Sequence, residues 1–172
     1  KEATSDPRIA VIPEIVKKYV KLGINVQLES GSGHRLYSDL AFQNAGAMIS
    51  NNRSELLATD VLLQVNPPAA DTIQQLAKNT TLVSFLDPFN NHDILSLLAA
   101  QQINTIGIEF IPRSTIAQKM DGLSSQANLA GYVAVSLATE RLDKVIPMMM
   151  TPAGTISPAK VFVIGAGVAG LQ

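Results

Sequence analysis

Short apolar runs alternate with amphipathic segments along the first two thirds of the chain. Pro13 stands at the first turn of a predicted helix that ends at Gly23, and residues 24–28 alternate in polarity as a strand does. The same alternation then recurs. It predicts further helices at 38–46, 54–57, 71–76 and 93–102, and further strands at 48–49, 61–65, 81–85 and 105–109. Strands that alternate with short helices predict an α/β fold, a doubly wound parallel sheet of the Rossmann or flavodoxin type with helices on both faces.

The pattern changes after the last of these strands. Residues 125–142 predict a longer helix whose small side chains suit close packing against a neighbouring helix, and residues 147–154 break the regularity. An apolar strand at 160–164 then runs into a glycine-rich turn. The predicted division is a first α/β domain at 1–124, a connecting helix and linker at 125–157, and the start of a second, truncated Rossmann domain at 158–172.

Composition narrows the classes of function. The chain has 172 residues, of which 47% are hydrophobic, and its formal net charge is -1. These values exclude disorder and the basic surface of a nucleic-acid-binding protein, so we expect no nucleic-acid partner. Cysteine is absent and only two histidines occur, which argues against disulfides, thiol catalysis and a metal site.

The chain also lacks the pattern of a membrane protein. No run approaches the roughly 18 consecutive apolar residues of a membrane span, and the polar start Lys1-Glu2-Ala3-Thr4-Ser5-Asp6 does not resemble a signal peptide. We therefore expect a soluble segment without a span. Because no initiator Met is present and the sequence stops two residues after Gly170, we expect the natural chain to continue past both ends.

The glycine-rich turn has the spacing G-x-G-x-x-G and follows an apolar strand. In a dinucleotide-binding turn, Gly165 permits the tight bend, Gly167 lets the backbone approach a pyrophosphate, and Gly170 allows close packing of helix on strand. The alternative is a chance match or plain packing, which the preceding strand disfavours. The turn does not choose between a nicotinamide and a flavin cofactor, because the acidic residue that binds the ribose is due about 20 residues on, past Gln172.

A polar loop at 112–132 places hydrogen-bonding side chains in an otherwise apolar chain, among them Arg113, Gln118, Asp121 and Ser124. From spacing alone, a solvated connector is as good an interpretation as a binding site, because loops are commonly polar.

Several segments together resemble one family. They are the loop at 112–132, the run Pro147-Met148-Met149-Met150-Thr151, the turn at 165–170, and the stretches at 6–10 and 81–85. Over essentially the whole chain the sequence resembles the NAD(H)-binding component (subunit alpha, domain I) of proton-translocating NAD(P) transhydrogenases, which share their fold with the alanine dehydrogenases.

The resemblance implies roles for the loop. Arg113, Asp121 and Ser124 are expected to bind the nicotinamide ring and its carboxamide, and Gln118 to reach toward the second nucleotide on the partner component. Arg113, Gln118 and Asp121 are thus the implied catalytic residues. Some members have a second Arg where this chain has Ile116. Tyr132 also matches a family position, although a Tyr on a packed helix is more often part of the core.

The resemblance further implies direct hydride transfer from NAD(H) on this component to NADP(H) on a partner component, coupled by a membrane component to proton translocation. It implies a homodimer located at the cytoplasmic face of the bacterial inner membrane or the matrix side of the mitochondrial one.

Two alternatives stay open, an NAD-dependent alanine dehydrogenase and a non-catalytic nucleotide-binding or oligomerisation module. Alanine dehydrogenases carry a Lys aligned with Gln64 and a His aligned with Asp87, and the absence of both favours the transhydrogenase. Arg8 is retained in both groups of enzymes and does not discriminate.

Overall fold

The computed structural model describes Glu2 and residues 6–172. The polar start of the chain, which argues against a signal peptide, therefore lies largely outside the described residues. The structure divides into two compact units, Lys1–Ile111 and Pro112–Gln172. Each unit is considered by itself below.

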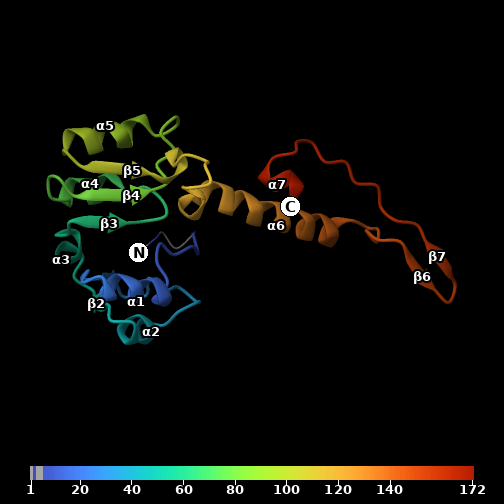
Figure 1. Cartoon of the computed structure of the whole chain (residues 1–172), viewed down its shortest axis with the longest axis horizontal. Helices are drawn as coiled ribbons and strands as arrows, with labels where there is room; N and C mark the ends of the chain where they lie inside the picture. Colours follow the sequence, from blue (N-terminus) through green and yellow to red (C-terminus); the bar gives the residue numbers. More distant parts are fainter. Residues whose placement is uncertain (1, 3–5) are drawn as a thin grey trace. The chain divides into compact units, whose positions relative to one another are not determined.

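In the first unit, helices and parallel strands alternate as the sequence predicts (Figure 1). The order is α1 (Pro13–Lys21), β1 (Gln27–Glu29), α2 (Asp39–Asn44), β2 (Met48–Ser50), α3 (Arg53–Leu57), β3 (Val61–Leu63), α4 (Ala70–Gln75), β4 (Thr81–Ser84), α5 (His92–Ala100) and β5 (Asn104–Gly107), followed by a 3-10 turn at Ile108–Phe110. The predicted α/β class with parallel strands is confirmed.

Local side-chain chemistry explains where several helices begin. Pro13 occupies the first turn of α1, where a missing N–H is not needed. The Ser38 hydroxyl accepts a hydrogen bond from the Ala41 amide at 3.3 Å, and the Asn52 side-chain oxygen accepts one from the Glu55 amide at 3.4 Å. Each cap satisfies an amide that the first helical turn leaves unbonded.

The strands of the first unit form two sheets in the described residues, where the sequence predicts one. β1 pairs with β2, and β3, β4 and β5 pair in that order. Each sheet has its own hydrophobic cluster. Val16, Leu28, Phe42, Ala45 and Ala47 form the first, and Leu57, Ile73, Leu76, Leu82, Leu86, Leu98 and Ile103 form the second.

The second unit departs further from the sequence prediction. A 3-10 turn at Gln118–Met120 leads into α6 (Gly122–Arg141), which begins three residues earlier than the predicted helix. β6 (Met149–Thr151) and β7 (Gly154–Ile156) form an antiparallel hairpin where only irregular chain was predicted. Residues 160–164, which the sequence predicts as the opening strand of a second domain, are not paired with any described strand. α7 (Val168–Leu171) follows the glycine-rich turn.

α6 and α7 approach closely at Gly131, a buried residue of α6. A Cβ atom at Gly131 would lie 2.3 Å from the Ala169 carbonyl oxygen, far inside van der Waals contact. One turn earlier, the Asn128 Nδ2 donates a hydrogen bond to Gln172 Oε1 at 2.6 Å. The backbone of α7 therefore rests on α6 at a position that only glycine leaves open.

We predict that Gly131→Ala displaces α7 from α6. The added methyl group meets a carbonyl oxygen that cannot rotate away, and such overpacking costs about 1–3 kcal/mol. In nuclear magnetic resonance spectra the amide signals of Gly165, Ala169 and Gly170 should shift, and chemical denaturation should give a lower free energy of unfolding. Ala134→Ser, on an exposed position of the same helix, is the matched control. Unchanged signals in Gly131→Ala would contradict the packing.

Candidate functional site

The end of the polar loop is fixed by Asp121, which caps α6. Its carboxylate accepts a hydrogen bond from the Ser124 amide at 2.8 Å. Hydrogen bonds from Ser124, first from its side chain and then from its amide, hold the pKa of Asp121 below its usual value, and the positive charge of Arg113 adds to this effect. Asp121 thus stays an anion at neutral pH, which suits both the cap and the positive end of the helix dipole.

The loop and the first two turns of α6 line an open cavity of about 840 Å³, and most of the residues that line it are polar. Arg113, Gln118, Asp121 and Ser124 all contribute to its wall, so the structure brings the four loop residues singled out in the sequence to one place. The other lining residues are Ser114, Thr115, Ser125, Asn128, Leu129 and Val168.

Ser125 and Asn128 belong to this cavity although sequence reasoning did not select them. With Asp121 and Ser124 they follow the spacing i, i+3, i+4, i+7, which places all four on one face of a helix. A predicted helix that began at Gly122, with Asp121 as its cap, would have placed Ser125 and Asn128 on the same face as Asp121 and Ser124.

The glycine-rich turn reaches the cavity through Val168, whereas Gly165, Gly167 and Gly170 do not line it. Gly165 has a φ of +101°, a conformation that other residues rarely adopt. A Cβ atom at Gly167 would meet nothing within 4 Å, so the backbone is open on that side. At Gly170 a Cβ atom would lie 2.1 Å from the Gly165 carbonyl oxygen, which makes the turn too tight for a larger residue.

Two positions near the loop lie outside the cavity. Ile116, where some relatives have an Arg, is 93% exposed. Tyr132 is 65% exposed, so its interpretation as a core residue is wrong. In the part of the chain that the structure describes, no cluster of His, Cys, Asp and Glu is arranged to bind a metal ion.

A second polar group lies in the first unit, near the carboxyl end of β3. Arg8 Nη2 lies 2.6 Å from Asp6 Oδ2, and Asn66 Nδ2 donates to the same oxygen at 2.7 Å. The hydrogen bonds from Arg8 and Asn66 lower the pKa of Asp6 far below its usual value. The charge of Arg8 is therefore already matched by a carboxylate of this chain.

The two positions that distinguish alanine dehydrogenases lie in the same unit. Gln64 follows β3, and its buried side-chain Oε1 has no hydrogen-bond partner among the described residues. The Asp87 carboxylate accepts two contacts from Asn90 Nδ2, at 2.9 and 3.0 Å. Neither position offers a cation.

Within Glu2 and residues 6–172, no helix combines the length and apolar character needed to cross a membrane.

Known proteins resemble this chain along its whole length. Subunit alpha of the NAD(P) transhydrogenase of Haemophilus influenzae is 38% identical over 168 residues, which are 97% of this chain and 33% of the relative. A crystal structure of the transhydrogenase of Sinorhizobium meliloti matches with a TM-score of 0.92 and 41% identity, covering 99% of this chain and 52% of that one. An L-alanine dehydrogenase structure, with a TM-score of 0.83 and 19% identity over 99% of this chain and 48% of that one, shares the fold.

The chain thus spans between a third and about half the length of these proteins. Residues 1–130 match the family model described as "Alanine dehydrogenase/PNT, N-terminal domain", and residues 134–172 match the one for the C-terminal domain. Since the first match alone covers well over half of the residues, the chain belongs to the alanine dehydrogenase/transhydrogenase (PNT) family.

Proposed function

We propose that this chain is the NAD(H)-binding part of an NAD(P) transhydrogenase, and that it holds NADH for hydride transfer to NADP on a partner component. The observation that carries the proposal is the convergence of Arg113, Gln118, Asp121 and Ser124 on one open cavity. The high identity to transhydrogenase subunits supports it, because the alanine dehydrogenase relatives are only 23–26% identical.

The residues present fit a dinucleotide. The cavity is open and lined mostly by polar residues, and the uncovered backbone at Gly167 leaves room for a close-lying phosphate group. The nicotinamide, when bound, supplies the hydride. The protein needs no general acid or base for this chemistry, and its task is to hold the two reacting carbons about 3–3.5 Å apart.

Each loop residue then has a positioning task. Arg113 offers hydrogen-bond donors to a carboxamide oxygen, and the Ser124 hydroxyl oxygen and the Asp121 carboxylate can accept from a carboxamide N–H. A carboxamide held from both sides fixes which face of the ring is presented. Gln118 lies on the 3-10 turn at Gln118–Met120, and we expect it to contact the second nucleotide.

The resemblance extends the proposal to assembly and location. The partners are the NADP-binding component and the membrane component that couples hydride transfer to proton translocation, on the cytoplasmic face of the bacterial inner membrane or the matrix side of the mitochondrial one.

We also expect the chain to form a homodimer, because α6 exposes apolar side chains on several sides. Leu129, Tyr132 and Val135 are 57%, 65% and 56% exposed. Light scattering of the full-length component at tens of micromolar should give the mass of a dimer. A monomer at that concentration would contradict this expectation.

Gln118→Asn and Asp121→Asn should slow hydride transfer about 100-fold while changing the affinity for NADH less than about threefold, because misplacement by about 1 Å costs rate rather than binding. The measurement is stopped-flow mixing of the full-length, NADH-loaded component with the NADP-binding component, alongside calorimetric titration of NADH.

Lys119→Gln is the matched control, since Lys119 lies between the two tested residues and does not line the cavity. It should leave both quantities unchanged. If the rate in Gln118→Asn and Asp121→Asn falls only in proportion to NADH occupancy, the loop is a simple binding surface and the proposed geometry is wrong.

We predict no alanine dehydrogenase activity. A keto acid needs a cation for its carboxylate, whereas Gln64 is uncharged, Asp87 repels an anion, and Arg8 is paired with Asp6. The full-length protein, in a preparation active in transhydrogenation, should show no alanine-dependent reduction of NAD. Turnover of about 1 per second or more, typical of enzymes, would assign the chain to the alanine dehydrogenases instead.

A further inference from the structure

Three buried polar atoms that have no hydrogen-bond partner among the described residues come from neighbouring strands of the first unit. They are Gln64 Oε1, Ser84 Oγ and Glu109 Oε2. Gln64 directly follows β3, Ser84 ends β4, and Glu109 lies in the 3-10 turn after β5. Because these strands are parallel neighbours in one sheet, all three residues lie at its carboxyl end.

The strand register places two of these residues in one row. The Gln64 amide donates to the Val83 carbonyl at 3.1 Å. This bond continues the register of β3 and β4 by one residue, so Gln64 lies beside Ser84. Ser84 in turn pairs with Gly107 on β5. Since paired residues of a parallel sheet project to the same face, Gln64, Ser84 and Gly107 form one row across three strands.

Glu109 returns to this row from beyond the end of β5. A Cβ atom built on Gly107 would lie 3.2 Å from Glu109 Oε2, so this oxygen lies close to where a side chain at Gly107 would begin. The other oxygen, Oε1, accepts hydrogen bonds from the Leu86 and Asp87 amides at 2.7 and 2.6 Å. These two bonds hold the carboxylate in place and leave Oε2 over the row.

The row lies on the face of the sheet that a hydrophobic cluster covers. Leu82 and Leu86, two residues before and after Ser84, belong to this cluster, and side chains alternate between the two faces along a strand. A Cβ atom at Gly107 would also lie 3.5 Å from Leu86 Cδ1, which puts Glu109 Oε2 on the same face. Ser84 is completely buried. The polar atoms are therefore separated from bulk solvent at the rim of an apolar core.

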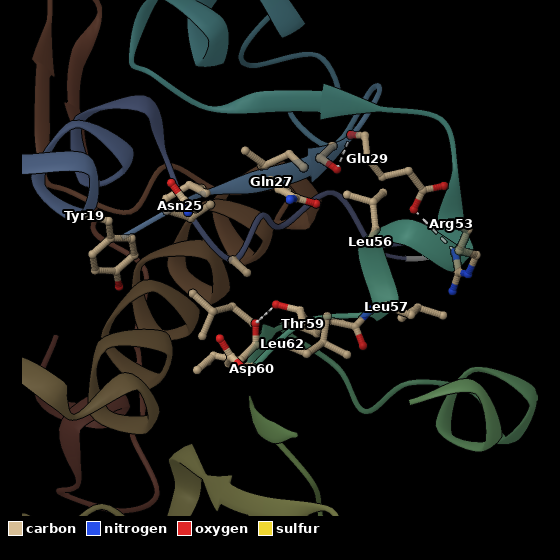
Figure 2. Close-up of a pocket in the computed structure, with 18 of the residues that line it drawn as sticks. Tyr19, Asn25, Gln27, Glu29, Arg53, Leu56, Leu57, Thr59, Asp60 and Leu62 are labelled. Carbon is tan, nitrogen blue, oxygen red and sulfur yellow. Dashed lines mark hydrogen bonds and ion pairs between the residues drawn. The ribbon is translucent and has the colours of Figure 1, made fainter. Parts of the chain in front are cut away.

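Gln64 lies between this row and a separate cavity. Figure 2 shows that cavity of about 590 Å³ beside β3, with Thr59, Asp60 and Leu62 at its wall, and Gln64 lines it as well. The Gln64 Oε1 atom is nevertheless buried, so the oxygen is turned away from the cavity. Leu62 packs against the hydrophobic cluster, and the alternation along the strand directs Gln64 to the same side.

The three atoms differ in what they can donate and accept. Gln64 Oε1 and the Glu109 carboxylate only accept hydrogen bonds, whereas the Ser84 hydroxyl has one hydrogen to donate. Direct contacts would pair that hydroxyl with one acceptor and leave the other acceptor unpaired. A water molecule donates two hydrogens and accepts from a hydroxyl, so it matches all three atoms at once. A cation would satisfy the oxygens but would give the hydroxyl hydrogen no acceptor.

We propose that one buried water molecule is bound at this row, where it donates to Gln64 Oε1 and Glu109 Oε2 and accepts from the Ser84 hydroxyl. Two hydrogen bonds of about 2.8 Å span roughly the distance of about 4.8 Å between adjacent strands, so the spacing suits a water bridge. The water joins the carboxyl ends of three strands. Through Glu109 it also supports the backbone of Asp87, whose φ of +45° is uncommon for a residue other than glycine.

A high-resolution crystal structure of the full-length component tests the proposal directly. A peak of electron density should lie about 2.6–3.2 Å from each of the three atoms. A crystal soaked in a rubidium or thallium salt should show no anomalous signal at this peak, because these cations do not replace a water molecule that also accepts from a hydroxyl. An anomalous signal at the row would overturn the proposal in favour of a monovalent cation. A direct hydrogen bond between Gln64 Nε2 and Glu109, with no density between the three side chains, would overturn it as well.

Thermal unfolding of variants of the full-length component tests the water bridge in solution. Gln64→Leu and Ser84→Ala each remove one partner of the water, so each should lower the midpoint of unfolding by about 2 °C or more. The double variant should lower it by clearly less than the sum, because both residues act through the same water molecule.

Gln74→Leu, at an exposed position of α4, is the matched control for the change at Gln64. Combined with Ser84→Ala, it should give additive shifts. Additive shifts for Gln64→Leu with Ser84→Ala would mean that the two residues share no partner, and would overturn the proposal. None of these measurements depends on NADH or on hydride transfer, so their failure and that of the proposed function are distinguishable.

Discussion

Parallel strands only three or four residues long place a strict demand on the first unit, because each contributes few backbone hydrogen bonds. Their stability depends on the helices that cover them and on pairing along both edges. The buried clusters around Leu82 and Phe42 meet the first requirement. Strand pairing is incomplete, because β1 pairs only with β2 and β3 pairs only with β4 in the described residues. The unit therefore has two sheets, each with its own hydrophobic cluster.

The second unit depends on a different kind of contact. α6 exposes apolar side chains on several sides, and its residue Gly131 lies close to the Ala169 carbonyl, so that the helix after the glycine-rich turn packs on α6. The same helix begins at the polar loop. One rigid element thus sets the distance between the loop residues and the turn, and precise spacing of this kind is what a reaction governed by positioning requires.

The sequence predicted regular features more reliably than it predicted contacts across the chain. Helix caps such as Ser38 and the alternation of apolar runs depend on near neighbours, and the elements they predict are present. The β6–β7 hairpin was missed because its Met-rich strand and Gly154 do not show a clear alternation. Residues 160–164 remain a predicted strand, because a strand also needs a neighbour to pair with and the local pattern does not provide one.

The site divides in the same way. Arg113, Gln118, Asp121 and Ser124 were identified from a resemblance, and the spacing of the loop alone could not distinguish them from a solvated connector. Ser125 and Asn128 were missed because the helix was expected to begin at residue 125, whereas Asp121 caps a helix that begins at Gly122. A shift of three residues in a helix boundary was enough to hide one face of the cavity.

The cap at Asp121 has a consequence for ligand binding. The Asp121 carboxylate both caps the first turn of α6 and lines the cavity. Fraying of that turn therefore also disrupts the cavity wall. Ligand binding at the loop and fraying of the first turn of α6 are then linked equilibria. A bound ligand raises the free energy of fraying by an amount that grows with the logarithm of its affinity. A ligand bound at the loop therefore also stabilises the start of the helix that supports the loop.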